Sequence, residues 1–127
     1  MAPGSGGTIL VVEDDDSMRE AIERLLVMAG FRCAAHGSAE ALLAQGVVEH
    51  SVCVISDLKL PGMTGLELLV ALRERGMSMP FILITAHDDP GLRDTAKRCG
   101  VADYLSKPFR GTALLQAVRG AIKAPPT

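Results

Sequence analysis

The feature that most constrains the fold of this chain is an alternation of short apolar runs with longer amphipathic segments, repeated five times. Continuous runs rich in Val and Ile are typical of strands buried on both faces, and apolar residues at helical spacing are typical of the helices between them. The predicted strands span residues 8–12, 31–35, 52–57, 81–84 and 102–105. The predicted helices span residues 18–29, 38–46 with its capping residues, 66–75, 90–99 and 112–123.

Strands that alternate with helices indicate an α/β protein, in which parallel strands are joined by right-handed crossovers. We expect a flavodoxin-like, doubly wound five-stranded parallel sheet of order 2-1-3-4-5 with five helices, since this order is common for five such strands. Ligands then bind where the strand order reverses, outside the carboxyl ends of strands 1 and 3. The residues that follow those two strands are therefore the first candidates for a functional site.

The composition is that of one ordinary globular domain. The chain has 127 residues, of which 48% are hydrophobic and 22% charged, and its formal net charge is −2. A nucleic-acid-binding domain is expected to be clearly basic, so this charge argues against direct DNA binding. No run of 18 or more apolar residues occurs, so we expect no membrane span.

The ends of the chain and its cysteines bound the domain and its compartment. Residues 1–7 have no basic or apolar region of a signal peptide and predict a flexible leader, whereas residues 124–127 read as the start of a linker or tail. The domain itself is expected over residues 8–123. Cys33, Cys53 and Cys99 form no C-x-x-C pair, which favours buried thiols in a reducing cytoplasm over disulfides or a zinc site.

Acidic residues stand at the two strand ends that the expected topology brings together. Glu13, Asp14, Asp15 and Asp16 follow the first strand, and Asp57 ends the third. Two carboxylates about 5 Å apart repel each other by roughly 3 kcal/mol at an effective dielectric constant near 20, so such a cluster needs a cation. Oxygen ligands favour a hard divalent ion, here Mg²⁺ with Mn²⁺ as an alternative. The competing interpretation is that these acids are solvated and cap a helix, with Asp16 best placed as the cap.

Polar residues also follow the last two strands. Thr85-Ala86 comes after the fourth strand, and Ser106-Lys107-Pro108 comes after the fifth. A hydroxyl and an ammonium group would then border the acidic cluster on one side. A tetrahedral anion such as a phosphoryl group needs this arrangement, with a metal on one side and a cation and a donor on the other.

Four short motifs in this order resemble those of the receiver domains of response regulators in two-component signalling. The motifs are Val-Val-Glu13-Asp14, Asp57-Leu-Lys-Leu-Pro61-Gly-Met-Thr-Gly65, Thr85-Ala86 and Lys107-Pro108-Phe109, and the resemblance runs from about Thr8 to Lys123. Three further stretches resemble receivers of FixJ-type nitrogen-fixation regulators. They are Gly30-Phe31, Ser38-Ala-Glu-Ala41 and Ile84-Thr-Ala-His-Asp88.

The resemblance implies a role for each motif. Asp57 would be the phosphoacceptor that attacks the phosphohistidine of a partner kinase. Tyr104 would be a switch aromatic that turns inward when Thr85 moves to the phosphate; the alternative is a rim tyrosine with its hydroxyl in water. The Mg²⁺ ligands would be the carboxylates of Glu13, Asp14 and Asp57 with the backbone carbonyl of Lys59. The phosphoryl oxygens would contact Lys107, Thr85 and the amide of Ala86, and the Lys107–Pro108 bond would be cis.

The function implied by the resemblance is a phosphorylation-gated switch rather than an enzyme, with self-catalysed phosphotransfer and slow autodephosphorylation. The implied partners are a cognate histidine kinase or phosphotransfer protein, and a second copy bound on phosphorylation through the face formed by residues 90–99, 102–105 and 112–123. DNA would be bound only through an output domain absent from this chain.

Three alternatives stay open at this point. The chain could be a free-standing relay receiver, or a receiver-like scaffold that takes no phosphate. It could also be a phosphohydrolase with an aspartate nucleophile. Such enzymes use an acid two residues after the nucleophile, and Lys59 at that position argues against this alternative.

Overall fold

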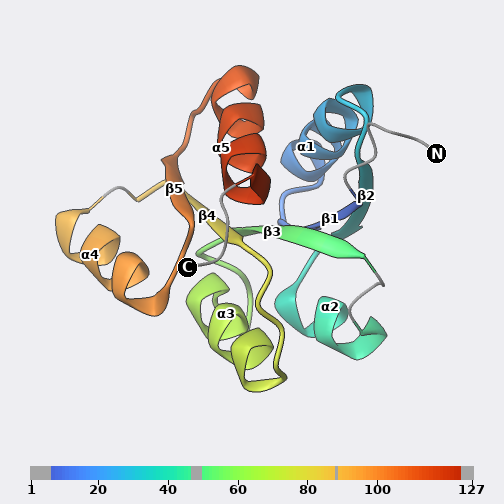
Figure 1. The fold of residues 1–127 in the computed structure, drawn as a ribbon. Helices are drawn as coiled ribbons and strands as arrows, with labels where there is room; N and C mark the ends of the chain where they lie inside the picture. Colours follow the sequence, from blue (N-terminus) through green and yellow to red (C-terminus); the bar gives the residue numbers. More distant parts are fainter. Residues whose placement is uncertain (1–6, 47–49, 88, 124–127) are drawn as a thin grey trace.

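The computed structural model describes residues 7–46, 50–87 and 89–123, and it contains the predicted alternation of strands and helices (Figure 1). The expectations for residues 1–6 and 124–127 lie outside the described residues. The strands are β1 (Thr8–Val12), β2 (Arg32–His36), β3 (Ser51–Asp57), β4 (Phe81–Thr85) and β5 (Asp103–Ser106). The helices are α1 (Asp16–Met28), α2 (Ala39–Gln45), α3 (Gly65–Glu74), α4 (Pro90–Cys99) and α5 (Gly111–Lys123).

The five strands form one parallel sheet of order β2-β1-β3-β4-β5, which confirms the predicted topology. Helices α1 and α5 lie on one face of the sheet, and α2, α3 and α4 lie on the other (Figure 1). The register keeps the carboxyl ends of the central strands level, with Val12 beside Ser56 and Asp57 beside Ile84. The residues after β1, β3, β4 and β5 therefore meet along one edge.

Alternate residues of the central strands enter two separate hydrophobic cores, as period-two alternation requires. Every residue of β1 and β4 is buried, which explains why both segments read as continuous apolar runs rather than as alternating patterns. The core beneath α1 and α5 contains Ile9, Val11, Ile55, Ile82 and Ile84. The core beneath α2, α3 and α4 contains Leu10, Val12, Val54, Phe81 and Leu83.

The cap of α1 differs from the prediction. Asp15, not Asp16, is the N-cap, because its side chain accepts a hydrogen bond of 2.8 Å from the amide of Met18. Asp16 is the first helical residue and pairs with Arg19 at 2.6 Å. The chain leaves β1 abruptly after Val12, so the helix begins two residues earlier than its apolar spacing indicated.

The cysteines and the helix lengths bear on two further expectations. Cys53 is buried as predicted, whereas Cys33 and Cys99 are only partly buried. Burial raises the pKa of Cys33 and of Cys53 to about 12. Among the described residues, every helix is too short or too polar to cross a membrane.

Candidate functional site

Three carboxylates from two separate strand ends meet at the switch point of the sheet. Each of Glu13, Asp14 and Asp57 offers one oxygen atom that lies within 4.8 Å of those of the other two. Glu13 is fully buried and Asp57 is 6% exposed, whereas Asp14 is exposed. The predicted convergence of the acids after β1 and β3 is therefore present, with two acids walled in by protein and one facing solvent.

Lys107 reaches into this cluster from the end of β5. Its Nζ atom donates hydrogen bonds to Oε1 of Glu13 at 2.8 Å and to Oδ2 of Asp57 at 2.9 Å. The backbone amide of Lys107 donates to the carbonyl of Thr85 at 2.7 Å, which ties this residue to the end of β4. The Lys107–Pro108 peptide bond is cis, as the resemblance implied.

The charged groups of this cluster shift one another's pKa values. Burial raises the pKa of Glu13 above its ordinary value, the hydrogen bonds from Lys107 and from the amide of Asp15 oppose the rise, and the nearby charge of Asp57 adds to it. Burial lowers the pKa of Lys107, but its contacts with Glu13 and Asp57 outweigh burial and leave that pKa above its ordinary value. The ammonium of Lys107 therefore stays charged and compensates the two buried carboxylates.

Thr85 is the last residue of β4, and Ala86 follows it directly. Thr85 is fully buried, and its hydroxyl accepts a hydrogen bond of 3.0 Å from the amide of His87. Ala86 and the side chain of Lys59 are exposed. Lys59 stands in the loop directly after β3, two residues beyond Asp57.

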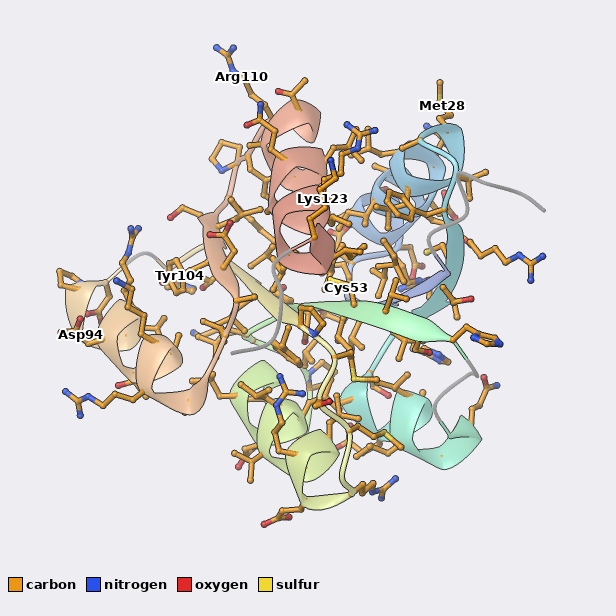
Figure 2. The ribbon with its side chains drawn as sticks, in the orientation of Figure 1. Met28, Cys53, Asp94, Tyr104, Arg110 and Lys123 are labelled. Atoms are coloured by element: carbon orange, nitrogen blue, oxygen red, sulfur yellow. The ribbon has the colours of Figure 1, made fainter. Side chains whose placement is uncertain are left out.

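Tyr104 occupies the rim between β5 and α4 (Figure 2). Its ring is partly exposed, its hydroxyl lies 3.5 Å from the backbone carbonyl of His87, and the guanidinium of Arg93 stacks 4.9 Å from its centroid. In this arrangement the hydroxyl of Tyr104 faces the connection between β4 and α4.

Two residues that hold the site loops escape the sequence patterns. The guanidinium of Arg19 donates to the backbone carbonyl of Glu13 at 2.9 Å while it pairs with Asp16. The carboxylate of Glu40 accepts from the amide of Met63 at 2.8 Å. The i, i+3 spacing of Asp16 and Arg19 is a signal for a pair on one helix face. No local pattern relates Glu40 to Met63, which is 23 positions away.

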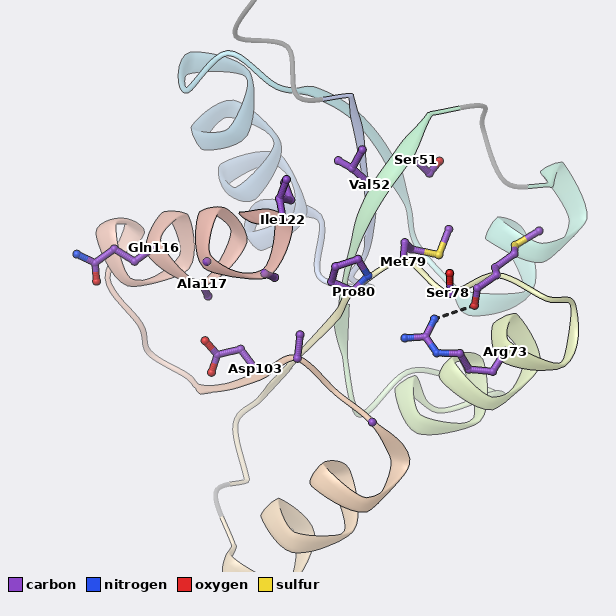
Figure 3. Close-up of a pocket in the computed structure, with 15 residues that line it drawn as sticks. Ser51, Val52, Arg73, Ser78, Met79, Pro80, Asp103, Gln116, Ala117 and Ile122 are labelled. Carbon is purple, nitrogen blue, oxygen red and sulfur yellow. Dashed lines mark hydrogen bonds between the residues drawn. The ribbon is translucent and has the colours of Figure 1, made fainter. Parts of the chain in front are cut away.

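A hollow lies at the opposite end of the sheet (Figure 3). It has a volume of about 990 Å³ and is lined by the residues that begin β3, β4 and β5, among them Ser51, Pro80 and Asp103. The hollow therefore lies at the amino ends of these strands, whereas the acidic cluster lies at the carboxyl ends. Ligands of such sheets bind outside the carboxyl ends. The acidic cluster, with its carboxylates and the ammonium of Lys107, is therefore the candidate functional site.

The donor set at the acidic cluster fits a hard divalent cation. Carboxylate oxygens from Glu13, Asp14 and Asp57 converge, and Mg²⁺ prefers a few carboxylates supplemented by water and carbonyl oxygens. Asp14 is exposed, so one of the three carboxylates is accessible from solvent. The ammonium of Lys107 already neutralises part of the same charge.

The fold and this site define a doubly wound α/β protein with an acidic, lysine-paired site at its switch point, and the comparisons with known proteins identify the family. A family model described as the response regulator receiver domain matches residues 9–119. The chain therefore belongs to the response regulator receiver domain family.

Individual relatives agree with this assignment. The chain is 41% identical over 112 residues to the transcriptional regulatory protein FixJ of Azorhizobium caulinodans, covering 88% of this chain and 53% of FixJ. It is 43% identical over 110 residues to the response regulator protein FleR of Pseudomonas aeruginosa, covering 87% of this chain and 23% of FleR. The expected likeness to FixJ-type receivers is thus confirmed. The chain spans about half the length of FixJ.

Solved structures give the same fold. The structure of FixJ-N superimposes with a TM-score of 0.84 at 34% identity, covering 95% of this chain and 97% of that one. The non-phosphorylated HemR receiver domain from Leptospira biflexa gives a TM-score of 0.87 at 23% identity, covering 95% and 98%. At that lower identity the likeness shows the fold alone.

Proposed function

We propose that this receiver domain accepts a phosphoryl group on Asp57 and uses it to switch its partners. The observation that supports this proposal best is the position of Asp57. Its carboxylate is nearly buried, lies beside two other carboxylates and bonds to the ammonium of Lys107. A nucleophile in such a place meets a phosphoryl group already surrounded by the charges that stabilise it.

The proposed reaction is transfer from a phosphohistidine. An oxygen of the Asp57 carboxylate attacks phosphorus, the bond between phosphorus and the imidazole nitrogen breaks, and the imidazole leaves with that electron pair. The product is an acyl phosphate on Asp57, and its slow hydrolysis resets the domain. Mg²⁺, when bound, neutralises charge on the transferred group and on the carboxylates. Its ligands would be Glu13, Asp14, Asp57 and the backbone carbonyl of Lys59.

The remaining site residues would bind the product. Phosphorylation changes the charge at Asp57 from −1 to about −2 and adds oxygens that accept hydrogen bonds. Lys107 would keep one of these oxygens, and the hydroxyl of Thr85 and the amide of Ala86 would contact others. The hydroxyl of Thr85, which accepts from the amide of His87, still has its own hydrogen to donate, and a shift of Thr85 toward the phosphoryl group would stretch that bond.

That movement of Thr85 is the proposed trigger of the switch. It opens space below the rim for Tyr104, whose outward contacts are to His87 and Arg93. The inward turn of Tyr104 would change the face formed by α4, β5 and α5, and a second copy or another partner would bind there.

The proposed setting is a cytoplasmic two-component pathway. Residues 8–123 would form the receiver, a histidine kinase or phosphotransfer protein would supply the phosphoryl group, and DNA would be bound by an output domain outside this chain. FixJ, of which the chain covers 53%, is a transcriptional regulatory protein, which supports this setting over a free-standing relay. A following DNA-binding segment in the full gene product would favour the regulator, and a stop codon would favour the relay.

The test is intact mass spectrometry after incubation with acetyl phosphate and Mg²⁺. The wild-type chain is expected to gain one phosphoryl group, and Asp57→Asn, which keeps the shape but removes the nucleophile, is expected to gain none. A phosphoryl group on a serine or histidine, or an unchanged gain in Asp57→Asn, would overturn the proposal.

A further inference from the structure

The loop between β3 and α3, residues 58–64, directly follows Asp57 of the acidic site and is anchored at both ends. The amide of Leu58 donates to the carbonyl of Ile84 at 2.9 Å, and the amide of Gly65 donates to the carbonyl of Leu58 at 2.9 Å. At its far end, Thr64 and Glu67 form a reciprocal capping box that starts α3. These contacts hold the two ends of the loop but not its middle, which includes Gly62 and Met63.

A carboxylate from another helix holds the middle of the loop. Oε2 of Glu40, in the first turn of α2, accepts a hydrogen bond of 2.8 Å from the amide of Met63. This bond lowers the pKa of Glu40, so the carboxylate is ionised at neutral pH. An ionised acceptor makes a stronger hydrogen bond with an amide than a neutral acceptor does.

The position of Glu40 is set by its neighbours. Ala39 and Leu42 are both fully buried, and they anchor α2 in the core beneath the sheet. Leu60, from the loop itself, belongs to the same core, and Met63 packs against it. Helix α2 and the loop therefore pack on the same core, and the hydrogen bond between Glu40 and Met63 bridges them.

The sequence of the loop is adapted to this bridge. Gly62 has a φ of +78°, which side-chain-bearing residues rarely adopt. A Cβ atom built on Gly62 would lie 2.5 Å from Oε2 of Glu40, so only glycine lets the carboxylate approach this closely. The amide of Met63 and the bare backbone of Gly62 therefore both lie at the carboxylate of Glu40.

We infer that Glu40 is a positioning residue for phosphoryl transfer, which holds in place the 58–64 loop that directly follows Asp57 and carries Lys59, a proposed Mg²⁺ ligand. The inference rests on the proposed function, since it concerns the same site. The bridge crosses from α2 to the loop and touches none of the reacting groups. Its loss would therefore change how well the site binds Mg²⁺ and how fast Asp57 reacts, while Asp57, Glu13 and Lys107 stay in place.

The test compares Glu40→Ala, which removes the acceptor, with Glu40→Gln, which keeps an acceptor of the same length. Glu74→Ala is the matched control, because Glu74 is an exposed helical glutamate whose side chain makes no hydrogen bond or ion pair with the described residues. Three quantities are measured for each variant. They are the dissociation constant for Mg²⁺, the rate of phosphorylation of Asp57 by acetyl phosphate, and the thermal midpoint without Mg²⁺.

Because the loop loses this hydrogen bond, Glu40→Ala is expected to bind Mg²⁺ severalfold more weakly and to react severalfold more slowly than wild type. Glu40→Gln is expected to recover most of both quantities, and Glu74→Ala to match wild type. Equal Mg²⁺ affinity and rate in Glu40→Ala and wild type would overturn the inference. So would a Glu40→Gln variant as impaired as Glu40→Ala.

The same experiment separates the inference from the proposed function. A wild-type chain that binds Mg²⁺ but takes no phosphoryl group refutes the proposed function, and the Mg²⁺ titration of the Glu40 variants still tests the bridge. A wild-type chain that binds no Mg²⁺ refutes both. A phosphorylated wild type with an unaffected Glu40→Ala refutes the inference alone.

Discussion

Oδ2 of Asp57 lies 2.9 Å from Nζ of Lys107, although the two residues are 50 positions apart in the chain. The side chain of Asp57 is 9% exposed and that of Lys107 is 17% exposed, so water screens their attraction only weakly. The same ammonium lies 2.8 Å from the fully buried Glu13. Lys107 therefore compensates two carboxylates that would otherwise repel each other inside the protein.

The first prediction concerns this compensation. Lys107→Met keeps most of the side-chain volume but leaves Glu13 and Asp57 without their cation, and a buried charge that loses its partner is strongly destabilising. Because the site is partly open to water, we expect a loss of about 1–3 kcal/mol in the free energy of unfolding, measured by urea denaturation in a chelator. Lys97→Met, at an exposed position of α4, is the control. An unchanged free energy in Lys107→Met would mean that the pair contributes nothing net.

The second prediction is a pH dependence. The pKa of Glu13 in the folded chain lies above its ordinary value, chiefly through burial, so its ionisation opposes folding. The stability of the wild type is thus full below the ordinary pKa of a glutamate and is reduced as the pH rises through the folded value. Lys107 titrates only in the alkaline range and adds nothing to this change.

The variant Glu13→Gln removes the titrating group while keeping its shape. Relative to wild type in a chelator, its free energy of unfolding should increase as the pH rises from about 4 to about 7. Denaturant melts at several pH values measure this difference. A difference that stays constant over that range, or that shrinks as the pH rises, would contradict the raised pKa.

The third prediction concerns Asp14, the exposed member of the acidic cluster. Asp14→Ala removes one anionic ligand and should weaken Mg²⁺ binding about tenfold or more, as measured by isothermal titration calorimetry. Asp94→Ala is the control, since Asp94 is an exposed acid on α4 outside the cluster (Figure 2). Equal affinity in Asp14→Ala and wild type would show that Asp14 is only a solvated residue near the cap and not a ligand.

The fourth prediction uses a property of the composition. The chain has one tyrosine and no tryptophan, so its intrinsic fluorescence reports on Tyr104 alone. Phosphorylation of Asp57 should make Tyr104 less accessible to iodide quenching, because the ring turns inward. In Thr85→Ala the chain should be phosphorylated without this change. Unchanged quenching in the phosphorylated wild type would favour a rim tyrosine that takes no part in switching.

The fifth prediction concerns Gly65, at the start of α3. A Cβ atom at this position would lie 2.4 Å from the backbone carbonyl oxygen of Asp57 and 3.0 Å from Cδ1 of Leu83. Since backbone atoms cannot move away cheaply, Gly65→Ala should destabilise the fold by about 1–3 kcal/mol and slow phosphorylation of Asp57.

Gly120→Ala is the matched control for that substitution. Gly120 lies within α5, and a Cβ atom there would meet no heavy atom within 4 Å. Alanine is favoured over glycine inside helices, so this variant should gain about 0.5–1 kcal/mol. Thermal denaturation of both variants provides the comparison, and equal stability of Gly65→Ala and wild type would contradict the close approach.

The topology could be predicted because each strand is marked by its own apolar run, and a parallel sheet aligns the carboxyl ends of its strands. Glu13, Asp57 and Lys107 follow such runs directly, so their convergence follows from the strand order alone. The choice of Asp15 over Asp16 as the cap could not be predicted. It depends on where the chain turns after β1, where the buried Glu13 also accepts a bond from the amide of Asp15.

The contacts that hold the loops were equally invisible in the sequence. Glu40 reads as one exposed residue of a helix, and its bond with Met63 exists only because α2 and the 58–64 loop share a core. Burial of the cysteines was predicted from residue type, and it is complete only for Cys53 on a central strand. Cys33 lies on β2, an edge strand that is covered less fully.

The claim on which the proposed function depends most is that Glu13, Asp14 and Asp57 share one divalent cation. Paramagnetic Mn²⁺ tests it directly, because nuclear magnetic resonance signals of amides near the bound ion broaden. Broadening should centre on residues 13–14 and 57–59, extend to residues 85–86, and be lost in Asp14→Ala. Broadening centred on other acids, such as Asp94 or Asp103, or none at all at these positions, would contradict the claim.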